Sequence, residues 1–161
     1  MSTGADVKRV QTPTAPAGDG WVRRFLLGML LFECFGTGVE LLLVGHWEDA
    51  WQWAPLVLML GGILAAAWCA AVPARAALRT MQALMGLFVL SGLAGTVLHV
   101  QAKMEFQLEV HPSLQGWALL WEAVKNQSPP TLAPAMMIQM GLLGLAYAYR
   151  HPGLRGPEKQ R

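Results

Sequence analysis

Two carboxylates lie inside the first long apolar stretch of the sequence, residues 25–44. Glu33 and Glu40 are seven residues apart, so two helical turns return them to one face, about 10 Å apart along the axis. Gly36 and Thr37 lie between them, and small residues let a neighbouring helix approach closely. A carboxylate costs roughly 2.5–3.5 kcal/mol near the centre of a bilayer, so we expect this face to point into a helix bundle.

Five more polar side chains fall within later apolar stretches, at depths that match the two glutamates when each residue rises about 1.5 Å. They are Gln82, Ser91, Thr96, His99 and Gln139. Together with Glu33 and Glu40 they would form a polar column if their helices face one another. One hypothesis is a proton, cation or solute path that uses Glu33, Glu40 and His99, because intramembrane ionisable residues are candidates for function. The alternative is structural, with Glu33 bonded to Gln139 or Ser91 to hold helices together.

Three histidines, His46, His99 and His111, are expected near acidic residues at the outer ends of the membrane spans. Mixed histidine and carboxylate ligands suit zinc, nickel or copper(II), which makes a metal- or haem-binding redox protein a further hypothesis. The spacing matches no metal motif, so histidines beside a solvated acidic rim are the alternative. Cys34 and Cys69 form no Cys-x-x-Cys pattern, and we expect two buried apolar residues rather than a disulfide.

The composition is that of a membrane protein. The chain of 161 residues is 54% hydrophobic and 14% charged, whereas a soluble domain carries about 25% charged residues. We therefore predict an all-α polytopic membrane protein with the lipid bilayer as its surroundings. The net charge of +2 gives no reason to expect nucleic acid, and no nucleotide-binding loop, catalytic triad or metalloprotease motif occurs.

Four apolar stretches have the length of a membrane span, which predicts a four-transmembrane-helix bundle over residues 21–151. The predicted spans are residues 25–44, 54–72, 78–100 and 132–149. Within the third span, Gly92, Gly95, Thr96 and His99 recur at helical steps, which fits a contact between helices. Residues 1–20 are polar and rich in proline and glycine, which predicts a disordered tail, and residues 152–161 form a short basic tail.

The connection between the third and fourth spans is too long for a simple turn. Residues 112–125 predict an amphipathic helix there, capped by His111 and starting at Pro112. Its apolar stripe consists of Leu114, Trp117, Ala118, Trp121 and Val124. Such a stripe suits a helix that lies on the outer membrane surface or covers the end of the bundle.

The basic residues predict the orientation. With a cytoplasmic N-terminus, four spans return the C-terminus to the same side, and ten of the twelve basic residues lie there, all except Lys103 and Lys125. Five tryptophans would then gather at the outer interface: Trp47, Trp51, Trp53, Trp117 and Trp121. We therefore expect a protein of the inner (plasma) membrane with both termini in the cytoplasm.

The favoured hypothesis on function is a small accessory or structural subunit without enzymatic activity. Small-residue stripes of this kind allow helices to pack with a second copy or within a larger membrane complex. The transporter and the redox protein remain the alternatives, and the sequence identifies no cofactor.

Overall fold

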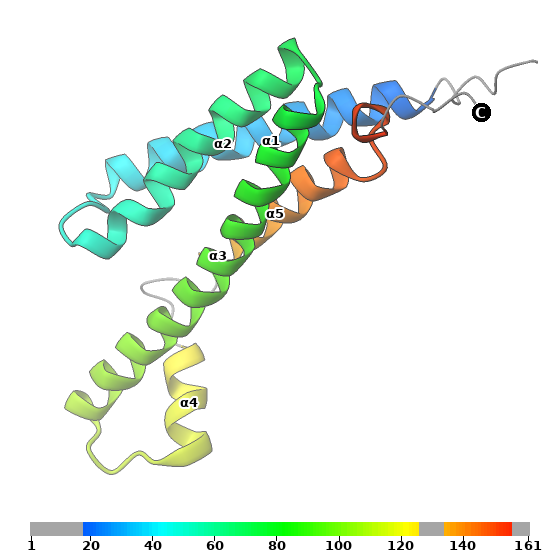
Figure 1. The fold of residues 1–161 in the computed structure, drawn as a ribbon. Helices are drawn as coiled ribbons and strands as arrows, with labels where there is room; N and C mark the ends of the chain where they lie inside the picture. The colour runs from blue at the N-terminus through cyan, green and yellow to red at the C-terminus, as the bar shows by residue number, and fades with distance from the viewer. Residues whose placement is uncertain (1–17, 126–133, 156–161) are drawn as a thin grey trace, which may run out of the picture.

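A computed structural model describes residues 18–125 and 134–155 of the chain. These residues form helices and contain no β-strand (Figure 1). The α-helices are α1 (Gly18–Leu43), α2 (Trp53–Ala71), α3 (Arg75–Val110), α4 (Gly116–Lys125) and α5 (Ala135–Ala148), and the two short 3₁₀ helices are η1 (Ala50–Gln52) and η2 (Pro152–Leu154). The predicted all-α class is therefore confirmed.

Three of the helices are long and apolar enough to cross a membrane, which is consistent with a membrane protein. The candidate spans are Gly20–Leu43, Ala50–Ala71 and Arg75–Val110. α5 is also apolar, but its 14 residues cover only about 21 Å. Residues 132 and 133, where the fourth span was expected to begin, lie outside the described residues, as do residues 1–17 and 156–161 of the predicted tails.

One apolar core joins α1, α2, the N-terminal half of α3, and α5. α2 packs against α1 and α3 from one side, and α5 packs against the same two helices from the other. The largest fully buried side chains come from all four helices: Leu30, Cys34, Cys69, Leu78, Met81, Met85, Phe88 and Met140. Both cysteines are buried free thiols, as expected.

α3 and α5 cross at very close range because glycines on both helices face the partner. A Cβ atom on Gly92 would lie 2.6 Å from Cγ1 of Ile138 and 2.8 Å from the carbonyl oxygen of Pro134. On α5, a Cβ atom on Gly141 would lie 2.7 Å from the carbonyl oxygen of Met85. The glycines of the predicted stripe in α3 therefore do serve a contact between helices, and that contact lies within the chain.

α3 is longer than the sequence indicated, and its end corrects two expectations. Residues 101–110 continue the helix instead of starting a loop, because no glycine or proline interrupts them before Pro112. His111 does not cap a following helix. It ends α3, and its backbone N–H donates to the carbonyl oxygen of Gln107 at 2.8 Å. The next helix begins only at Gly116, whose φ of +55° favours glycine.

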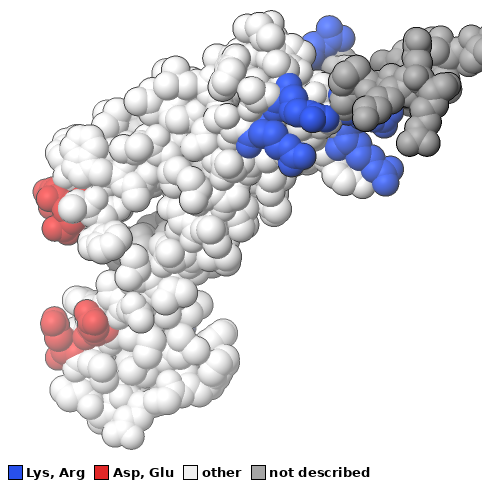
Figure 2. Space-filling model, in the orientation of Figure 1, with Lys and Arg blue, Asp and Glu red and all other residues white. Residues whose placement is uncertain are grey.

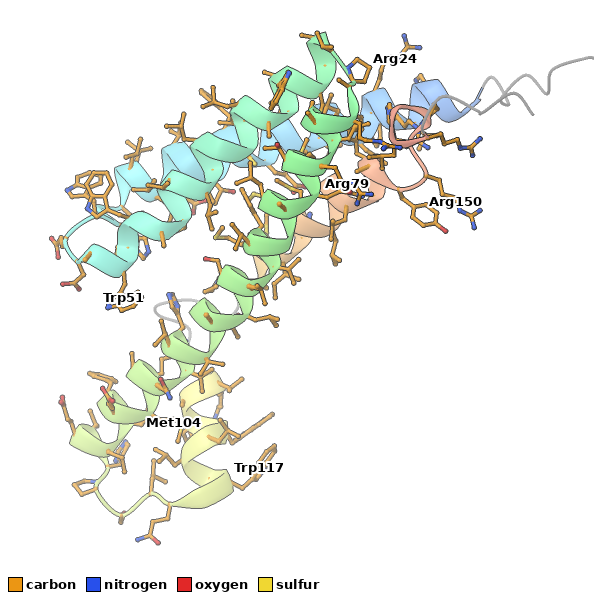
Figure 3. The ribbon with its side chains drawn as sticks, viewed as in Figure 1. Arg24, Trp51, Arg79, Met104, Trp117 and Arg150 are labelled. Carbon is orange, nitrogen blue, oxygen red and sulfur yellow. The ribbon has the colours of Figure 1, made fainter. Side chains whose placement is uncertain are left out.

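α4 packs against the C-terminal half of α3, away from the shared core (Figure 1). Residues 101–110 of α3 and α4 together are called the distal segment below. Charge divides the molecule along its length (Figure 2). Arg24, Arg79 and Arg150 lie at one end, the basic end, whereas Trp51 lies at the opposite end of the core helices (Figure 3). Glu48 and Asp49 are exposed in the α1–α2 connection at that opposite end, called the acidic end.

Candidate functional site

α1 presents two different faces to its surroundings. Leu27, Leu30 and Cys34 point into the core and are buried. The opposite face is exposed along the whole helix and is called the open face: Phe25, Gly28, Phe32, Gly36, Glu40 and Leu43. The expectation that the glutamate-bearing face points into the bundle was therefore wrong for Gly36 and Glu40.

The physical reason is that lipid and protein interior are similarly apolar surroundings. Leucines and a cysteine fill the core side of α1, and phenylalanines with glycines cover the other side. Hydrophobicity alone therefore does not distinguish the two sides of a membrane helix. Gly36 lies on the side of α1 that no other helix of the described chain covers, because a Cβ atom placed on it would meet nothing within 4 Å.

Glu33 lies at the edge of the open face, where α1 meets α5. The side-chain amide of Gln139 donates from Nε2 to Oε1 of Glu33 at 2.9 Å. The second oxygen, Oε2, is buried and has no hydrogen-bond partner among the described residues. Gln139 is itself exposed and borders a shallow apolar groove on α5, lined also by Ala135, Ile138, Leu142, Leu143 and Ala146. The structure thus pairs two of the predicted polar residues and leaves one carboxylate oxygen unsatisfied.

Glu40 lies two turns further along α1, about 10 Å from Glu33 toward the acidic end. It is exposed, and its side chain has no hydrogen bond or ion pair with the parts of the chain that the structure describes. Its place in the last turn of the helix is also electrostatically unfavourable, because the C-terminal end of a helix carries partial negative charge.

Three other members of the predicted column contact residues outside that column instead. Thr96 donates from Oγ1 to the carbonyl oxygen of Gly92 in its own helix at 2.8 Å. Ser91 contacts Sδ of Met137 at 3.8 Å. Gln82 accepts from its neighbour Arg79 at 3.3 Å. Among the seven residues, only Glu33 and Gln139 are joined to each other by a hydrogen bond within the described chain.

The three histidines are not gathered at one place. His46 and His99 are close enough to interact electrostatically: burial lowers the pKa of His46, and positive charge on His99 lowers it further. Nδ1 of His99 is buried without a hydrogen-bond partner among the described residues. His111 lies twelve residues beyond His99, about 18 Å along α3. No group of three His, Cys, Asp or Glu residues in the described chain is placed to hold a metal ion.

Arg23 has a role that the sequence did not reveal. Its guanidinium donates to the carbonyl oxygen of Tyr147, to that of Tyr149 at 3.0 Å and to that of Arg150 at 3.5 Å. These contacts satisfy carbonyls that the C-terminal end of α5 leaves without partners. α5 has no basic residue in its own last turn, and that absence could have indicated a cation supplied from elsewhere. Arg23 therefore ties α1 to the end of α5.

The apolar stripe of α4 does not pack against α3. Trp117 is 75% exposed and Trp121 is 55% exposed, and Figure 3 shows Trp117 pointing away from α3. The buried residues of the distal segment are instead Leu119, Ala123 and Lys103. Figure 3 also shows Trp117 on the distal segment, apart from Trp51 at the acidic end of the core helices.

No protein-family model matches the chain, and no curated protein or solved structure matches it either. Function therefore has to be inferred from the residues of this chain. The features that stand out are the open face of α1, with Gly36 and Glu40, and the adjoining pair of Glu33 and Gln139.

Proposed function

We propose that the chain is a small inner-membrane protein with four spans, the fourth of which contains α5, and with both termini in the cytoplasm. The placement of charge supports this topology. Exposed arginines gather at the basic end, acidic residues lie at the acidic end and on the distal segment, and the surface drawn between them is uncharged (Figure 2). The distal segment then extends beyond the outer membrane surface.

Within that topology, the protein acts as an accessory subunit without enzymatic activity, and the open face of α1 is where it joins its complex. The observation that supports this is the exposure of Glu40. Glu40 comes sixteen positions after Arg24, which places it about 24 Å from the basic end, inside a hydrocarbon layer about 30 Å thick. A carboxylate facing lipid at that depth is unfavourable, so a partner that covers it is favoured.

The glycines support the same conclusion. Gly92, Gly95, Gly141 and Gly144 are used for packing inside the chain, where an added Cβ would meet neighbouring atoms at 3.0 Å or less. Gly28 and Gly36 meet nothing within 4 Å and lie on the same face as Glu40. Small residues at such positions let a second helix approach the backbone closely.

The proposal is tested by extracting the protein from its native membrane in a mild detergent and measuring its size by blue-native electrophoresis. We expect a band of an assembly larger than the single chain. Gly36→Leu should reduce that band, because the added side chain occupies the surface that the partner would contact. A band that contains only the single chain would refute the proposal.

The chain offers a matched control for this substitution. Gly86 on α3 also meets nothing within 4 Å, and it lies on another helix, away from the open face of α1. Gly86→Leu therefore adds the same bulk without touching the proposed surface, and the large assembly should persist. Equal loss of the assembly in both variants would show that added bulk, and not the open face, is responsible.

A further inference from the structure

We infer that the open face of α1 binds a transmembrane helix of a different protein, and that this helix carries a lysine or arginine at the depth of Glu40. The inference rests on the proposed function and adds the chemistry of the partner. It starts from two carboxyl groups that the chain leaves incompletely satisfied within the candidate span Gly20–Leu43.

Both carboxyl groups require hydrogen-bond donors that the described chain does not supply in full. Glu40 is exposed and its carboxyl group has no hydrogen bond or ion pair with the described residues, and Oε2 of Glu33 is buried without a partner among them. Carboxylates only accept hydrogen bonds, and lysine and arginine only donate them. A charge-assisted hydrogen bond to a cation is the strongest contact available to such a group. Charge complementarity therefore favours a basic side chain opposite Glu40.

A second copy of this chain is excluded as the source of that cation. Residues 25–74, 80–102 and 126–149 contain no lysine or arginine, and Lys103, the next basic residue of α3, is buried within its own chain. Arg79 lies at the basic end (Figure 3), whereas Glu40 lies in the last turn of α1, toward the acidic end. A second copy in the same orientation would bring Glu40 against Glu40, and two like charges at one depth repel each other.

The surface of α1 next to Glu40 has room for a second helix. Gly36 lies between Glu33 and Glu40 in the sequence, one turn before Glu40 on the open face, and nothing lies within 4 Å of its missing Cβ. A helix that crosses α1 at Gly36 therefore comes close to the backbone, within reach of Glu40 for a long basic side chain. The exposed ring of Phe32 lies on the N-terminal side of the same crossing point.

The test uses synthetic single-span helices of leucine and alanine, about 24 residues long, reconstituted with the labelled full-length protein in phosphatidylcholine vesicles. One peptide carries a lysine about five residues from its centre, near the depth of Glu40, and the other carries leucine there. Association is measured by fluorescence energy transfer. We expect the lysine peptide to associate, and Glu40→Gln to weaken that association about three- to twenty-fold, the range of polar contacts between helices in membranes.

Glu48→Gln is the matched control, because Glu48 is also an exposed acid but lies in the connection after α1. It should leave association unchanged. If the lysine and leucine peptides associate equally well, or if neither associates, the inference about charge is overturned. Energy transfer between two labelled copies of this chain, lost in Gly36→Leu, would show that the open face binds a second copy. That result would overturn the inference of a different partner protein. The proposed function fails separately, if blue-native electrophoresis of native membranes shows only the single chain.

Discussion

The close crossing of α3 and α5 predicts that one glycine of α3 is essential to packing and another is not. Gly92→Ala places a Cβ atom 2.6 Å from Cγ1 of Ile138, 2.8 Å from the carbonyl oxygen of Pro134 and 2.9 Å from the amide nitrogen of Ile138. Carbon atoms in contact prefer about 3.5–4.0 Å, and two of these neighbours are backbone atoms, so α5 has to move away. Overpacking of this kind costs about 1–3 kcal/mol.

Gly86→Ala in the same helix isolates this contact, because its Cβ would meet nothing within 4 Å. Both substitutions gain the same helix propensity, about 0.5–1 kcal/mol, so that gain cancels in the comparison. We therefore expect Gly92→Ala to be less stable than Gly86→Ala by about 1–3 kcal/mol. Unfolding in mixed micelles titrated with sodium dodecyl sulfate, followed by circular dichroism, measures the difference. Equal stability of the two variants would refute the described contact between α3 and α5.

Three further predictions follow from individual contacts. Arg23→Gln should destabilise the protein by about 1–3 kcal/mol and speed hydrogen exchange after α5, because it removes charged donors from three carbonyls, whereas Arg24→Gln next to it should have little effect. A double-mutant cycle of Glu33→Leu and Gln139→Leu in the same unfolding assay should give a coupling energy of about 0.6–1.7 kcal/mol, and zero coupling would contradict the hydrogen bond. Because the pKa of His46 is lowered, the unfolded chain binds a proton more readily, so His46 should make folding stability fall as the pH drops below about 6.5. His46→Asn should reduce that fall, and NMR of labelled histidines should show His99→Asn raising the pKa of His46.

The helical class and the position of α2 followed from the sequence because they depend on local patterns. Residues 54–72 were predicted and Trp53–Ala71 is observed, since an uncharged stretch with Pro55 in its first turn has one favourable conformation in a membrane. The predicted end of α3, near residue 100, was wrong for a related reason. The apolar stretch ends near Val100, but the helix ends where the backbone is interrupted, and Pro112 is the first residue that does so.

The candidate site was harder to predict because it depends on which side of each helix meets protein. The spacing of Glu33 and Glu40 correctly places both near one side of α1. Gln139, which bonds to Glu33, was one of the two partners predicted for it, the other being Ser91. The spacing contains no information on whether that side faces lipid or the core. Arg23 was missed as a partner of α5 because a contact across 124 residues has no local pattern.

The central claim is that another polypeptide covers the open face of α1 in the native membrane. The most direct measurement replaces Phe32, which is 74% exposed on that face, with a photo-crosslinking amino acid and analyses the adducts formed in intact cells. The same replacement at Leu90, 62% exposed on α3, is the control for random contact. The account predicts a defined adduct with a different protein at position 32 and none at position 90. Only lipid adducts at both positions would contradict it.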